Sequence, residues 1–195
     1  MISFKKYGIL VSVGLVLFAG SVGAGSISVP GFSFENPTGY SNNNPSYITG
    51  WLANSPSFYG AEGNSIAAKF FSPGTSDRLQ AGFLNLDSRG TATLTSAASL
   101  ATISNNTIYT LTVALGNNTS PDADQYGAPG DMFIRLLANG NVIATNNVIN
   151  SSVPNGTIGD YSLSFATGTS SSLAGQSLTI QLGTSSANRA NAFKI

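Results

Sequence analysis

The chain has 195 residues, of which only 8% are Asp, Glu, Lys or Arg, against about 25% in an ordinary soluble domain, and its formal net charge is zero. It contains no Cys and no His, which excludes a disulfide scaffold and any catalytic set built on those residues, and disfavours a structural zinc site. The length fits one domain, and the absence of a cationic stripe excludes a nucleic-acid binder.

The first predicted element is an export signal at residues 1–24. Lys5 and Lys6 form a positive start, the run Gly8–Phe18 is almost entirely apolar, and the small residues Val22-Gly23-Ala24 fit a cleavage site. The apolar run is shorter than the roughly 20 residues that a membrane-spanning helix needs. We therefore expect cleavage after Ala24, export to the periplasm or the cell exterior, and one mature domain at residues 25–195 without a membrane span.

The mature chain shows short windows of alternating apolar and polar residues, separated by turn signals roughly every 8 to 12 residues. Such alternation predicts half-buried antiparallel strands. It is clearest at Ile108–Leu115, where Tyr109, Leu111, Val113 and Leu115 share one face. In chain order the predicted strands are Ile27–Phe34, Tyr47–Leu52, Ser65–Phe71, Leu79–Leu86, Thr91–Ser96, Ile108–Leu115, Met132–Ala138, Val142–Asn146, Asp160–Ala166, Gln176–Leu182 and Ala190–Ile195.

Turn chemistry supports the same fold class. Asn139-Gly140, between two predicted strands, indicates a tight hairpin because both residues accept positive φ. Only Ala97–Ile103 has the composition for one helical turn. The sequence therefore predicts an all-β protein, a two-sheet antiparallel β-sandwich of jelly-roll type.

Aromatic residues outside the clearest strands are candidates for a ligand site. Flat rings beside Asn and Gln amides would suit a sugar ring or a small hydrophobic ligand. We select Tyr47, Tyr59, Phe83 and Tyr126 as candidate ligand-binding residues. Trp51 is assigned to the core instead, because Trp is highly buried on average.

A loop between Pro121 and Pro129 carries Asp122 and Asp124. Their Asp-Ala-Asp spacing can place two carboxylates on one metal ion, although the loop lacks the acids and terminal Glu of an EF-hand. An ordinary solvated acidic loop stays the alternative. Eight scattered acids place no pair at glycosidase separation, which disfavours a hydrolase.

Five segments together resemble one family, the exported bacterial β-sandwich proteins related to the hapalindole-type (Stig) cyclases of cyanobacteria. The segments are Val29–Pro37, Tyr47–Trp51, Asn106–Val113, Arg135–Gly140 and Leu173–Leu178. Relatives of this family include secreted proteins with a PEP-CTERM sorting tail, and its sandwich is similar to calcium-binding carbohydrate-binding modules. The resemblance covers nearly the whole mature chain.

The resemblance implies roles for particular residues. It places Phe83 and Tyr126 beside a concave pocket, and it makes Glu35 a ligand of a structural calcium together with a last-strand carboxylate. That last-strand position is also the acid that starts rearrangement of an indole-terpene substrate in the cyclases. Here it is Asn191, which cannot donate a proton in that way and would offer calcium only an amide oxygen.

Two functions follow as hypotheses. The first is a non-enzymatic exported module that binds a polysaccharide or a small hydrophobic ligand and contains structural calcium, with Glu35 and Asn191 as one candidate metal site and Asp122 and Asp124 as another. The second is a Stig-cyclase-like enzyme acting on a prenylated indole, with Asn191, Phe83 and Tyr126 in its site. Because of Asn191, we favour the first.

Overall fold

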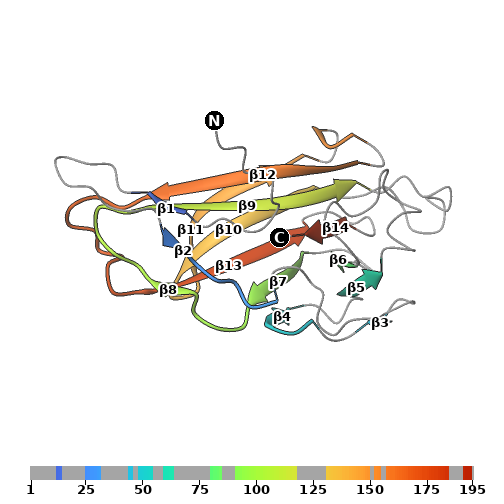
Figure 1. Ribbon diagram of the computed structural model, residues 1–195, viewed down its shortest axis with the longest axis horizontal. Coiled ribbons are helices and arrows are strands. Elements are labelled where there is room, and N and C mark those ends of the chain that lie inside the picture. Colours follow the sequence, from blue (N-terminus) through green and yellow to red (C-terminus); the bar gives the residue numbers. More distant parts are fainter. Residues whose placement is uncertain are drawn as a thin grey trace.

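Figure 1 shows a computed structural model of the chain. The structure describes residues 12–14, 25–31, 44–45, 48–54, 59–63, 80–84, 91–117, 131–149, 152–154, 157–184 and 191–194. At residues 12–14, 25, 44–45, 59–63, 80–81, 83, 117 and 191–194 it describes the backbone alone.

The described residues form strands and no α-helix. The strands are β1 Ser12–Gly14, β2 Gly25–Ser26, β3 Asn44–Pro45, β4 Trp51–Ala53, β5 Tyr59–Gly63, β6 Gln80–Leu84, β7 Ala92–Ser96, β8 Ala101–Thr102, β9 Ile108–Asn117, β10 Met132–Ala138, β11 Asn141–Val148, β12 Thr157–Ala166, β13 Ser177–Thr184 and β14 Asn191–Lys194. The described part of the chain accordingly offers no helix with the length and hydrophobicity to cross a membrane. The prediction of an all-β protein is confirmed.

The strands form two antiparallel sheets (Figure 1). The eight-stranded sheet has the order β2-β1-β9-β14-β6-β5-β3, with β12 paired to the other side of β9. The six-stranded sheet has the order β11-β10-β13-β7-β4, with β8 also on β13. The two-sheet prediction is confirmed, while the jelly-roll connectivity and the likeness to carbohydrate-binding modules stay predictions.

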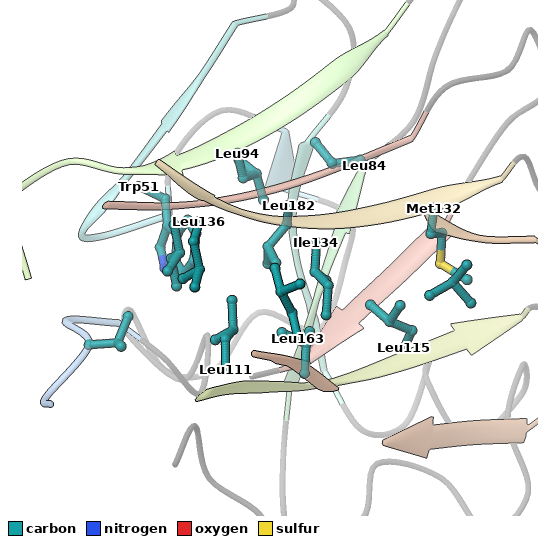
Figure 2. Packing of buried hydrophobic residues seen from close by; sticks show 14 of the residues in the cluster. Trp51, Leu84, Leu94, Leu111, Leu115, Met132, Ile134, Leu136, Leu163 and Leu182 are labelled. Atoms are coloured by element: carbon teal, nitrogen blue, oxygen red, sulfur yellow. The ribbon is translucent and has the colours of Figure 1, made fainter. Parts of the chain in front are cut away.

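One hydrophobic core lies between the sheets, and both contribute side chains to it (Figure 2). From β9, Leu111, Val113 and Leu115 are fully buried, on the face that the alternation predicted. The six-stranded sheet supplies, among others, Met132, Ile134, Leu136, Leu94, Ile180 and Leu182. Burial of these aliphatic side chains is the main favourable term that holds the two sheets together.

Most predicted strands are found within one or two residues of their predicted bounds. Met132–Ala138 is confirmed as β10, and it joins β11 through a two-residue loop in which Asn139 and Gly140 have φ of 46° and 82°. The helical turn predicted at Ala97–Ile103 is wrong, because this stretch bends and then pairs with β13 as β8. The predicted strand Ser65–Phe71 lies outside the described residues.

Two predicted strands differ from the structure where their segments meet. Gly31 and Gly50 both have positive φ, 66° and 85°, so the chain turns at each of them. A Cβ atom on Gly31 would collide with the carbonyl oxygen of Thr49, and one on Gly50 would lie 2.7 Å from that of Pro30. Of the predicted strand Ile27–Phe34, residues 27–31 are described and none is in a strand, so this prediction is wrong for them, and Tyr47–Leu52 is limited to its last two residues by the turn at Gly50.

β1 falls within residues 1–24, the stretch predicted to be an export signal, and pairs with β9 and β2. The signal, its cleavage and the export of the protein stay predictions.

Candidate functional site

The last strand, β14, lies between β9 and β6 and brings distant parts of the chain together. Ala192 pairs with Gly116 on one side and with Phe83 on the other. β5 continues the sheet beyond β6. Figure 1 shows β14, β6 and β5 gathered at one end of the molecule.

Three of the residues selected from the sequence lie in two adjacent rows of this sheet. Asn191 pairs with Leu84, and Leu84 pairs with Tyr59, so these residues form one row across three strands. Phe83 is in the next row, between Ala192 and Gly60. Neighbouring strands are about 4.8 Å apart, so Asn191 and Tyr59 are about 10 Å apart.

The centre of the first row was missed by sequence reasoning. Leu84 is 1% exposed and belongs to the core cluster. It lies in the predicted strand Leu79–Leu86, whose period-2 alternation places Leu84 on the face opposite Phe83 and was the signal that could have assigned it to the core-facing row. We call the six residues of the two rows the β14–β6–β5 rows: Asn191, Leu84, Tyr59, Ala192, Phe83 and Gly60.

The remaining candidates cannot be placed with them. Tyr47, Tyr126, Glu35, Asp122 and Asp124 lie outside the described residues. Among the residues that the structure describes, no three His, Cys, Asp or Glu side chains gather as a metal site. Calcium binding therefore stays a prediction.

Trp51 is in the core, as predicted. Its side chain is 5% exposed, and its indole Nε1 donates a hydrogen bond to the carbonyl oxygen of Gly31, at 3.1 Å. An apolar ring with its one polar atom satisfied is ordinary core packing. Trp51 is therefore a structural residue.

Asp160 is the most C-terminal acid of the chain, and it does not replace an acid at position 191. It pairs with Ala114, and Ala114 pairs with Lys194 of β14. Successive residues of a strand belong to opposite faces, so Lys194 and Asn191, three positions apart, are on different faces. Asp160 thus belongs to the face of the sheet opposite Asn191.

The comparisons with known proteins identify the family. A family model described as HpiC1-like, HpiC1 cyclase, matches residues 25–193. The chain belongs to the HpiC1-like cyclase family. A search of curated proteins finds no match.

Solved structures of cyanobacterial cyclases share the fold of this family member. A cyclase from Fischerella sp. TAU has 21% sequence identity and a TM-score of 0.75, covering 86% of this chain and 92% of its own. A Fischerella sp. TAU cyclase in complex with 4-(1H-indol-3-yl)butan-2-one has 20% sequence identity and a TM-score of 0.74. The match covers 86% of this chain and 93% of the cyclase chain. The Stig cyclase Fisc from Fischerella sp. TAU, in complex with (3Z)-3-(1-methyl-2-pyrrolidinylidene)-3H-indole, has 21% sequence identity and a TM-score of 0.74. The match covers 86% of this chain and 93% of the Fisc chain.

These findings correct the first functional hypothesis. A non-enzymatic glycan-binding module is wrong, because the chain belongs to a cyclase family and the ligands in the similar structures are indoles. The residue types misled because an aromatic ring beside an amide suits a sugar face and an indole equally well. The relation to the Stig cyclases is shown, whereas a PEP-CTERM tail and a carbohydrate-binding-module likeness are not.

Proposed function

We propose that this protein is a cyclase that rearranges and cyclises a prenylated indole, and that it binds this substrate at the row of Asn191, Leu84 and Tyr59. Membership of a cyclase family is the observation that carries the proposal. Two similar Fischerella structures contain an indole molecule, which supports the substrate class.

The residue types in this row fit a neutral aromatic substrate. The row of Asn191, Leu84 and Tyr59 contains one aromatic residue, one amide and no charged residue, whereas Phe83 belongs to the next row, on the opposite face of the sheet. Apolar residues with a single polar group are the usual composition of a small-molecule site, in which the polar group fixes orientation. A prenylated indole offers one N–H group and a large apolar surface, so its chemistry matches these residue types.

Asn191 sets the role that this position can have in the reaction. Its amide can donate and accept hydrogen bonds, but it has no acidic proton near neutral pH. The chain therefore binds and orients the substrate without an acid at position 191, and we expect slow turnover. A carboxylic acid at this position would add general acid catalysis, which contributes about 10²–10⁴-fold in other enzymes.

The experiment compares wild-type protein with the Asn191→Asp variant. Both are incubated with a prenylated indole, and the isomeric products are separated by chromatography and assigned by NMR. We expect binding of 4-(1H-indol-3-yl)butan-2-one by both proteins in a calorimetric titration, and at least tenfold faster turnover by Asn191→Asp.

Asn147→Asp is the matched control, because it introduces the same carboxylate at an exposed position of β11 in the other sheet. It should leave turnover unchanged. If neither wild type nor Asn191→Asp binds the indole, and both give only the products of the uncatalysed reaction, the proposal is wrong.

A further inference from the structure

A polar row crosses the six-stranded sheet on the side away from the core. Thr145, Arg135, Gln181, Thr95 and Leu52 pair in turn across β11, β10, β13, β7 and β4. Residues alternate between faces along a strand, and Ile134 and Leu136 on either side of Arg135 are in the core. Arg135 and its row therefore lie on the outer face.

Hydrogen bonds connect four side chains of this row. Arg135 donates from Nε to Thr145 Oγ1 and from a terminal nitrogen to Gln181 Oε1, both at 3.1 Å. Gln181 in turn donates from Nε2 to Thr95 Oγ1, at 3.1 Å. The amide of Gln181 is thereby oriented so that its oxygen faces the guanidinium.

A buried phenyl ring supports the guanidinium from below. The Arg135 Cζ atom lies 3.7 Å from the centre of the Phe133 ring, which is a stacking distance. Phe133 is 1% exposed although it lies on the outer face, and its ring occupies the space that a Cβ atom on Gly183 would need. The Phe133 ring, packed against Gly183, is therefore the flat surface on which the guanidinium of Arg135 lies.

The guanidinium of Arg135 has no anionic partner among the described residues. Within the part of the chain that the structure describes, Arg135 forms no ion pair, and both of its hydrogen-bond partners are neutral. Its two bonds run to strands on opposite sides of β10, so in a planar guanidinium the parallel N–H pair at the tip stays available. The hydroxyls of Thr145 and Thr95 already accept a bond, which leaves their protons to donate.

We propose that this row is a binding site for a carboxylate ligand, held by the free N–H pair of Arg135. Two parallel N–H groups match the two oxygens of a carboxylate, and a single positive charge balances its single negative charge. Packing alone does not require a cation here, because Met or Leu would also cover Phe133. A side chain with large rotamer entropy is immobilised on three sides, and this preorganisation favours binding.

The site is independent of the proposed cyclase function. It lies in the six-stranded sheet, whereas the β14–β6–β5 rows belong to the eight-stranded sheet. A failure of one proposal therefore does not affect the other.

The test follows the Arg135 Nε–H signal by NMR while sodium acetate, and then sodium benzoate, is titrated at constant ionic strength against sodium chloride. We expect a saturable shift in the millimolar range with both carboxylates and none with chloride. A shift that does not saturate, or that chloride reproduces, would overturn the proposal.

Two variants separate recognition from folding. Arg135→Met keeps a cover over Phe133 and removes the charge, so carboxylate binding, measured by calorimetry, should weaken at least tenfold. Gln181→Glu supplies an internal carboxylate, so it should weaken binding as much while raising the melting temperature. Undiminished acetate binding by a folded Gln181→Glu protein would contradict the role of Arg135.

Discussion

The indole N–H of Trp51 donates to the carbonyl oxygen of Gly31, at 3.1 Å, and so ties β4 to a segment 20 residues earlier in the chain. Beside this bond, Gly31 and Gly50 bring two backbone segments into contact with positive φ angles. Both glycines and Trp51 lie in segments that carry the family resemblance. Their role in this chain is to connect residues 25–31 to the sandwich.

The contact at Gly50 should be intolerant of a side chain. In Gly50→Ala the new Cβ atom would approach the carbonyl oxygen of Pro30 at 2.7 Å while φ is 85°. We expect a loss of about 3 kcal/mol in the free energy of unfolding. Urea unfolding followed by the fluorescence of Trp51, the single tryptophan of the chain, measures it directly.

Gly140→Ala is the control for that variant. Gly140 has nearly the same φ, 82°, but a Cβ atom there would meet nothing within 4 Å. Backbone strain alone should therefore cost about 1 kcal/mol. Equal losses in the two variants would show that the contact with Pro30 does not matter.

A second prediction concerns the contact between Phe133 and Gly183 beneath Arg135. Gly183→Ala places a methyl group in the Phe133 ring and should lower the free energy of unfolding by about 1–3 kcal/mol. In a Phe133→Ala background the ring is gone and only the carbonyl oxygen of Ala92, 2.8 Å from the new Cβ atom, remains in its way, so the cost should be smaller. A double-mutant cycle by denaturant unfolding tests this coupling, and additive losses would argue against it.

A third prediction concerns alkaline pH. Burial raises the pKa of Tyr161 above its ordinary value of 10.0. The folded protein then holds this proton more tightly than the unfolded chain, so the stabilising contribution is complete below pH 10 and is lost as pH rises through the folded pKa. Unfolding of wild type and Tyr161→Phe between about pH 9 and pH 12 should show a shallower decline for the variant. Parallel curves would assign the decline to other tyrosines.

A fourth prediction concerns calcium. If Glu35 and Asn191 hold calcium, or Asp122 and Asp124 hold an ion in their loop, removal of the ion should destabilise the folded chain, because binding to the native state adds to its stability. We expect EGTA to lower the melting temperature and added Ca²⁺, but not Mg²⁺, to restore it. Glu35→Gln should reduce this response. Identical melting curves in EGTA and in calcium would count against the site.

The local alternation of apolar and polar residues was enough to predict a strand wherever that strand has one buried face. In β9, Tyr109, Leu111 and Leu115 are buried, and a two-residue period in the sequence follows from that burial. β5 was not predicted, because Gly60, Ala61 and Gly63 supply neither alternation nor β-branched residues. Its place in the sheet depends on its partner β6 rather than on its own residues.

By itself, the sequence determined the all-β class, the core face of the main strands and the hairpin at Asn139-Gly140, because each depends on residues adjacent in the chain. Only the tertiary structure decided that Asn191, Leu84 and Tyr59 share a row and that Arg135 lies over Phe133 beside Gln181. Pairing between distant strands is set by how whole faces pack into one core. No local pattern encodes which strand becomes the neighbour of another.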